Sequence, residues 1–177
     1  MNSEDFISGE LVLIDKEKGW SSFDVVNKIR GAIKKKFLIK KIKVGHAGTL
    51  DPLATGILPI AMGEATKAVF APMDGEKTYR FTIRWGEERD TDDAEGRVVC
   101  KSEKRPTPDQ IRDALSLFNG LTEQVPPTFS AVKVNGIRAY NLARKGHSPK
   151  LKTRSVKIQK LTLTSCLDEN HALVEMV

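Results

Sequence analysis

The sequence predicts one globular domain that contains both α-helices and β-strands, and three observations support this prediction. The chain has 177 residues, of which 40% are hydrophobic and 29% are charged, so it can bury one core. Apolar residues recur at steps of three and four between Phe23 and Phe37, which is the period of a helix. Apolar and polar residues alternate over 77–85, which is the period of a half-buried strand.

The first predicted helix follows a short apolar strand at 11–14. Ser21 and Asp24 offer this helix a start that resembles a capping box. The side chains expected on its buried face are Phe23, Val26, Ile29, Ile33 and Phe37. Its lysines fall largely on the other side, so we expect an amphipathic helix with a basic outer face.

A loop rich in glycine separates the next two strands, which we expect at 41–45 and 56–62. A helix should then begin near Glu64 and end around Pro72 and Gly75, because proline and glycine disfavour its continuation. The clear strand at 77–85 follows.

The rest of the chain predicts, in order, an exposed acidic turn, a strand at 97–100, a helix, an irregular insertion, and strands at 156–163 and 171–177. The acidic turn does not match a calcium-binding EF-hand loop, because Glu95 stands where that loop needs glycine. Thr107, Pro108 and Gln110 form a good helix start, and Gly120 closes the helix. Its expected apolar face is Ile111, Ala114, Leu115 and Phe118.

Positive charge is gathered in two runs that contain no acid. Eight lysines or arginines lie between Lys28 and Lys43, and nine lie between Lys133 and Lys160. The net charge is +6. Segregated positive charge of this kind suits a phosphate backbone and indicates a nucleic-acid partner, although a single basic run is more often a solvated face.

Several classes of site are excluded because their motifs are missing. The sequence has no P-loop, no nucleophile elbow and no HExxH motif. His46, His147 and His171 lack the spacing of metal ligands, so we expect no metal and no cofactor. Cys100 and Cys166 are too few for a disulfide framework and are expected to be buried thiols. Without an apolar export signal or an apolar run of about 18 residues, a cytoplasmic protein with no membrane contact is expected.

Residues 45–63, GHAGTLDPLATGILPIAMG, are the most unusual stretch of the chain. They set one acid, Asp51, in an apolar run behind His46, and Pro52 favours an extended backbone at Asp51. A partly solvated carboxylate in such a place is either functional or part of an ordinary Asp-Pro turn before a buried strand. Tyr79 also allows two interpretations, because a tyrosine on the apolar side of a strand is more often a core residue than a catalytic one.

Six segments in this order resemble the TruB family of bacterial tRNA pseudouridine synthases. They are LVLIDKEKGWSSFDVVNKIR, GHAGTLDPLATG, GEATK, KTYR, DTDDAEG and PPTFSAVKVNGIRAYNLARKG, and they cover nearly the whole chain. The resemblance implies the pseudouridine synthase fold, an α/β (α+β) domain with a mixed, largely antiparallel sheet flanked by helices. It implies a catalytic domain over 1–177 in which an insertion around 126–152 acts as a thumb over the RNA.

The same resemblance assigns roles to individual residues. Asp51 corresponds to the catalytic aspartate, Tyr79 would stack on the flipped base, and His46 would help to hold the opened T-loop. In the family, an arginine in a later Gly-Thr-Tyr-x-Arg motif orients the carboxylate, and this chain ends before any such motif. Because Val177 also ends the chain in the middle of a predicted strand, we expect a fragment, truncated at its C-terminus, with weak or no activity.

The implied reaction is the isomerisation of the T-loop uridine (uridine 55) of tRNA to pseudouridine. We expect a monomer that binds the T-stem-loop of tRNA and uses no cofactor. Two alternatives remain: a relative of dyskerin that depends on a guide RNA, and an RNA-binding or tRNA-folding module without catalysis.

Overall fold

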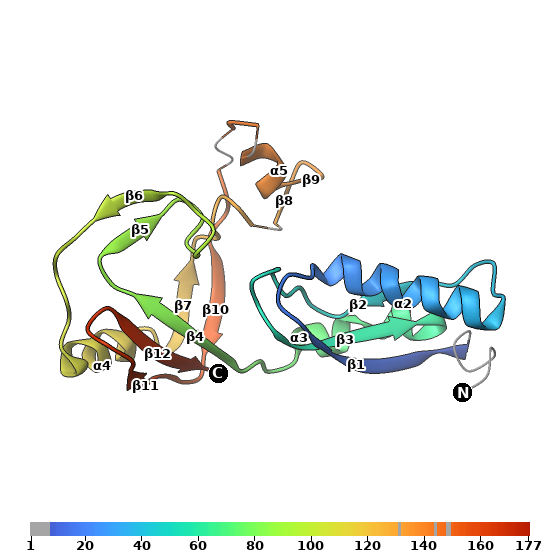
Figure 1. Cartoon of the computed structure of the whole chain (residues 1–177), viewed down its shortest axis with the longest axis horizontal. Helices are drawn as coiled ribbons and strands as arrows, with labels where there is room; N and C mark the ends of the chain where they lie inside the picture. Colours follow the sequence, from blue (N-terminus) through green and yellow to red (C-terminus); the bar gives the residue numbers. More distant parts are fainter. Residues whose placement is uncertain (1–7, 131, 144, 148–149) are drawn as a thin grey trace. The chain divides into compact units, whose positions relative to one another are not determined.

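The computed structural model describes residues 8–130, 132–143, 145–147 and 150–177. Contacts between residues divide the chain into two compact units, Met1–Glu76 (unit 1) and Lys77–Val177 (unit 2). Each unit has its own hydrophobic core, with an antiparallel sheet and a helix packed against it (Figure 1). The single catalytic domain over 1–177 stays a prediction.

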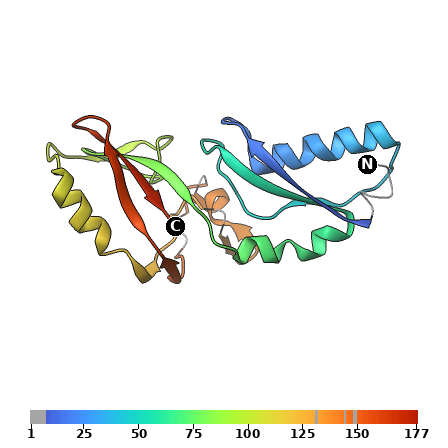
Figure 2. The same cartoon turned by 90° about the horizontal axis from the view of Figure 1, so that it is seen from below.

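Unit 1 is a three-stranded antiparallel sheet covered by one long helix. The strands are β1 (Glu10–Lys16), β2 (Val44–His46) and β3 (Gly56–Met62), in the order β1-β3-β2. The helix α2 (Ser22–Phe37) runs along one face of this sheet (Figure 2). A 3-10 helix, η1 (Gly63–Ala68), and a short helix, α3 (Phe70–Asp74), end the unit.

The start of α2 confirms the predicted capping box. The Ser21 hydroxyl accepts a hydrogen bond from Asp24 N, and the Asp24 carboxylate accepts one from Ser21 N. The core beneath α2 consists of Val25, Val26, Ile33, Val44, Leu58, Ile60 and Met62. The expectation that Phe23 is buried is wrong, because its side chain is 62% exposed. Phe23 lies in the first turn at the margin of the apolar stripe.

Unit 2 contains a second antiparallel sheet with its own helix. The sheet has the order β11-β12-β4, formed by Leu161–Cys166, His171–Met176 and Tyr79–Arg84. The helix α4 (Pro108–Ser116) packs against β11, and its core contacts are Ile111, Leu115, Leu161, Ala172 and Val174 (Figure 2). The predicted capping box of Thr107 and Gln110 is present. Phe118 is exposed, contrary to expectation, because α4 already ends at Ser116.

Three two-stranded sheets complete unit 2. They pair β5 (Glu87–Arg89) with β6 (Val98–Lys101), β7 (Gly120–Gln124) with β10 (Arg154–Ile158), and β8 (Lys133–Val134) with β9 (Ile137–Arg138). The predicted short helix of the insertion is α5 (Ala139–Ala143). Cys100 and Cys166 are exposed, so the prediction of buried thiols is wrong. Cys100 lies on β6, whose residues are all exposed, and Cys166 is the last residue of β11.

All strand pairs in the described residues are antiparallel, and helices flank the two larger sheets. This confirms the predicted class of fold. No helix in the described ranges is long and apolar enough to cross a membrane.

Candidate active site

Asp51 lies on the loop that connects β2 with β3 in unit 1. Its backbone carbonyl accepts a hydrogen bond from Ala54 N at 3.0 Å, so residues 51–54 form a tight turn. The Asp51 side chain is exposed, and it makes no hydrogen bond or ion pair among the residues that the structure describes. The expectation of a partly shielded carboxylate is therefore wrong. Gly48 and Gly56 bound this loop with φ angles of 130° and 133°, which side chains rarely allow.

Two hydrogen-bonded ties hold the loop on either side of Asp51. The buried Ser22 hydroxyl donates to Leu50 O and accepts from Leu50 N, both at 2.9 Å. On the other side, Gly19 N donates to Pro52 O at 2.8 Å. Because Leu50 also packs against the core of unit 1, the backbone that precedes Asp51 is fixed by both polar and apolar contacts.

A buried lysine fixes the segment that makes these ties. Lys16 is 1% exposed, and its ammonium donates to Trp20 O at 2.7 Å and to Glu17 O at 3.1 Å. A buried ammonium must be hydrogen-bonded, and here backbone carbonyls supply the acceptors. Sequence analysis missed both Lys16 and Ser22. The signal for Lys16 was available, because the alternation of β1 places it on the inward side with Val12 and Ile14.

His46 is the last residue of β2 and stands at the start of the Asp51 loop. The strand pairs with β3 so that His46 faces Ile60, and the next residue, Ala47, donates its N–H to Pro59 O at 2.9 Å. The Nδ1 atom of His46 is buried and has no hydrogen-bond partner within the described part of the chain. An unpaired buried nitrogen is uncommon in a folded protein, so this atom sets His46 apart from the other residues of the loop.

Tyr79 is the first residue of β4 in unit 2, and it pairs with Met176 across the sheet. Its side chain is 41% exposed, so it is not a fully buried core residue. The structure thus places Asp51 on a loop of unit 1, His46 at the end of the strand that leads into this loop, and Tyr79 on a strand of unit 2.

The predicted thumb contains the β8–β9 hairpin and α5. The hairpin turns at Asn135 and Gly136, whose φ angles of 50° and 82° fit the predicted turn pair. Phe129 is 37% exposed, while the side chain of Tyr140 and all of Arg144 lie outside the described residues. A role of this segment in RNA contact stays a prediction.

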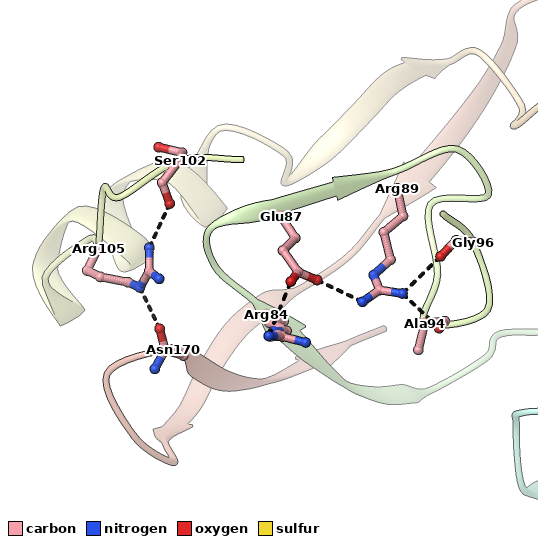
Figure 3. A network of polar contacts seen from close by, with 8 residues as sticks. All are labelled: Arg84, Glu87, Arg89, Ala94, Gly96, Ser102, Arg105 and Asn170. Atoms are coloured by element: carbon pink, nitrogen blue, oxygen red, sulfur yellow. Dashed lines mark hydrogen bonds and ion pairs between the residues drawn. The ribbon is translucent and has the colours of Figure 1, made fainter. Parts of the chain in front are cut away.

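A polar network in unit 2 shows what the acidic turn does (Figure 3). Arg89 donates to Ala94 O at 3.2 Å, to Gly96 O at 2.9 Å and to Glu87 at 2.7 Å. The Arg89 guanidinium, followed by Arg84, lowers the pKa of Glu87. An open depression of about 440 Å³ beside this network is lined by residues of β4, β5 and the acidic turn, and contains none of the predicted site residues. The network therefore holds a loop together.

The comparisons with known proteins agree on one family. A family model whose description reads "TruB family pseudouridylate synthase (N terminal domain)" matches residues 34–176. Two relatives that bear the name tRNA pseudouridine synthase B are 53% identical: one from Rhizobium etli, matched over 96% of this chain and 53% of its own length, and one from Rhodopseudomonas palustris, over 93% and 43%. The chain spans about half the length of the curated relatives that it matches.

Solved structures show the same fold. A Cbf5-Nop10-Gar1 complex contains a chain that matches with a TM-score of 0.65 and 25% identity, over 99% of this chain and 41% of that one. An H/ACA RNP bound to a substrate RNA containing 2′-deoxyuridine matches with a TM-score of 0.57 and 21% identity, over 97% and 38%.

Proposed function

We propose a function from the premise that this chain belongs to the TruB family of pseudouridylate synthases. The chain carries the catalytic carboxylate of a tRNA pseudouridine synthase, and its substrate is the T-loop uridine, uridine 55. The observation that carries the proposal is Asp51 itself. Its side chain is exposed and unpaired within the described chain, while the backbone on both of its sides is held by hydrogen bonds.

The chemistry of the isomerisation matches a single carboxylate. The C1′–N1 bond of uridine breaks, a C1′–C5 bond forms, C5 loses its proton and N1 gains one. Atoms and electrons balance without an oxidant or an external energy source. Asp51 would act at the sugar either as a nucleophile on carbon or as a base, as carboxylates do in glycosidases.

Other residues have supporting roles in this proposal. Tyr79 stacks on the base after it leaves the RNA helix. His46, which is partly exposed at the start of the Asp51 loop, contacts the opened T-loop. The lysines at the end of α2 and after it, Lys34, Lys35, Lys36, Lys40, Lys41 and Lys43, are exposed and supply positive charge for phosphates. We also propose that the protein works in the cytoplasm and is a monomer. Sedimentation velocity tests whether it is a monomer.

The test is the release of tritium from C5-labelled uridine in a T-arm stem-loop RNA. The proteins compared are this chain, the same chain joined to the remaining part of the Rhizobium etli relative, and the Asp51→Asn form of each. We expect the Asp51→Asn forms to lose the release of tritium and to keep the RNA affinity of the proteins from which they are made. If RNA is bound equally by all forms and none releases tritium, the chain is a binding or tRNA-folding module, and the proposed activity is wrong.

A further inference from the structure

Residues 19–22 are tied to the Asp51 loop at two points, and an aromatic residue, Trp20, lies between these points. Gly19 N is tied to Pro52 O, and the Ser22 hydroxyl is tied to the backbone of Leu50. Asp51 lies between the two tied residues of its loop, and Trp20 lies between the two tied residues of the facing segment. Adding the standard backbone distances to the 2.8 Å tie puts the Trp20 and Asp51 Cα atoms no more than about 14 Å apart.

The backbone of Trp20 itself makes a further hydrogen bond, in addition to the ties at Gly19 and Ser22. Its carbonyl accepts the hydrogen bond of the buried Lys16 ammonium at 2.7 Å. The chain therefore fixes where the Trp20 side chain leaves the backbone. A residue whose main chain is fixed by a buried charge and whose neighbours are tied to the Asp51 loop is well placed to position a substrate.

Trp20 and Phe23 present aromatic surface that the core of unit 1 does not use. Trp20 is 39% exposed and Phe23 is 62% exposed, and neither belongs to the cluster of buried side chains under α2. One exposed apolar residue needs no explanation. Two exposed aromatic residues within four positions, on a segment tied to the loop of an exposed carboxylate, offer surface on which flat ligands can stack.

We propose that Trp20, with Phe23 beside it, stacks on an RNA base that neighbours the target nucleotide. The inference rests on the proposed function, because it requires an RNA whose target sugar reaches Asp51. A nucleotide that flips out leaves its neighbours without a stacking partner, and an aromatic side chain can replace that partner. Trp20 is a positioning residue here, since it does not touch the reacting atoms.

A purely structural role for Trp20 makes a different prediction. Trp20 directly precedes the cap residue Ser21, and an apolar residue there often packs against the fourth residue of the helix, which in α2 is the buried Val25. Leucine would preserve such packing and remove the aromatic ring, whereas phenylalanine would preserve both. The pair Trp20→Leu and Trp20→Phe therefore separates packing from stacking.

The experiment measures RNA affinity and tryptophan fluorescence together. The chain contains two tryptophans, Trp20 and Trp85, and Trp85 packs against the core of unit 2. A labelled T-arm stem-loop reports binding by anisotropy, and the emission difference between the wild type and Trp20→Phe isolates Trp20. We expect RNA to quench the Trp20 emission, and an RNA with abasic nucleotides on both sides of the target to quench it much less.

The affinity changes should follow the aromatic ring. Trp20→Leu should weaken RNA binding by about five- to hundredfold, the range of one stacked base, and Trp20→Phe by less than about threefold. Leu117→Ala is the matched control, because Leu117 is an exposed apolar residue directly after α4 and lies outside both the Asp51 loop and the basic segment at the end of α2. It should leave the affinity unchanged.

Two outcomes would contradict the stacking role of Trp20. One of them leaves the proposed function intact, and the other contradicts it as well. If labelled RNA binds but the Trp20 emission and the affinity of Trp20→Leu stay unchanged, Trp20 only packs against the protein and the proposed function survives. If the wild type and the protein joined to the relative's remaining part both fail to bind the RNA, the proposed function is wrong together with the stacking role.

Discussion

The loop of residues 90–96 and the loop of residues 47–55 use their aspartates in opposite ways. In the loop of residues 90–96, the carboxylates of Asp90 and Asp93 hold the loop together. Asp90 accepts a hydrogen bond from Arg97 N at 2.8 Å, and Asp93 accepts hydrogen bonds from the Thr91 hydroxyl at 2.6 Å and Glu95 N at 2.9 Å. The carboxylates of these two residues therefore already accept hydrogen bonds from their own loop and the residue that follows it.

The loop of residues 47–55 leaves its aspartate unoccupied. Its backbone is held from outside, by the Ser22 hydroxyl and the Gly19 N–H, and in the described residues the Asp51 carboxylate has no partner. Under the proposed function, the reactive acid is therefore not the one in the segment richest in acids. It is the carboxylate that its own loop does not bind, on a backbone that other elements hold.

The largest expected effect comes from removing one aspartate of each loop. In the chain joined to the remaining part of the Rhizobium etli relative, Asp51→Ala should lower turnover at least about a thousandfold and leave the free energy of unfolding within about 0.5 kcal/mol, because no contact is lost. Asp93→Ala should do the reverse, with unchanged turnover and a loss of about 1 kcal/mol for its two hydrogen bonds. Tritium release and urea unfolding measure the two quantities, and a stability loss in Asp51→Ala alone would contradict the comparison.

Replacing Lys16 should show how much the hold on the Asp51 loop depends on one buried charge. Lys16→Met keeps most of the side-chain volume but leaves Trp20 O and Glu17 O without their donor. We expect the free energy of unfolding to fall by about 2–3 kcal/mol, since the lost hydrogen bonds involve a charged group. The measurement is the urea midpoint of Lys16→Met against Lys18→Met, which removes an exposed lysine two positions further along the chain and should change stability by less than about 0.5 kcal/mol.

Local chemistry made some elements of this fold predictable from the sequence. Both capping boxes, at Ser21 and at Thr107, depend only on residues three positions apart, and both are present. The strand at 56–62 matches β3. Asp51 stood out because its surroundings in the sequence are unusual for an acid.

Other features could not be predicted, because they depend on which residues meet across the fold. Ser22 contacts Leu50 over 28 positions in the sequence, and no local pattern indicates that pairing. The exposure of Phe23, Phe118 and both cysteines likewise depends on where each helix or sheet is covered. The periodicity of apolar residues predicts which face of a helix or strand is buried, but it does not predict which residues at the edge of that face stay exposed.

Ser22 offers a test of the tie next to Asp51. Ser22→Ala leaves the N–H and carbonyl of Leu50 without their partner, so we expect a loss of about 1–3 kcal/mol in the free energy of unfolding. Because the backbone before Asp51 is then less well fixed, kcat should fall by about ten- to hundredfold. Urea unfolding and single-turnover tritium release measure the two effects.

The neighbouring serine is the matched control. Ser21→Ala removes the cap of α2 but touches neither Leu50 nor Pro52, so it should cost about 1 kcal/mol of stability and leave kcat unchanged. Equal losses of kcat in both variants would show that the helix start, and not the tie to Leu50, positions the loop.

The smallest expected effect is a pH dependence at the cap of α2. The Ser21 hydroxyl, together with the Ser21 N–H, lowers the pKa of Asp24 below its ordinary value of 3.8. A carboxyl whose pKa is lowered in the folded state stabilises the protein above its unfolded pKa, and this contribution is lost as the pH falls through the folded pKa. The stability advantage of the wild type over Asp24→Asn should therefore be constant above about pH 5 and shrink below about pH 4. Chemical unfolding of both proteins across this range measures it. Ser21 supplies both donors, so Ser21→Ala should make the stability depend less steeply on pH between about pH 3 and pH 5. If the wild type and Asp24→Asn lose stability equally as the pH falls, the capping box contributes no pH-dependent stability.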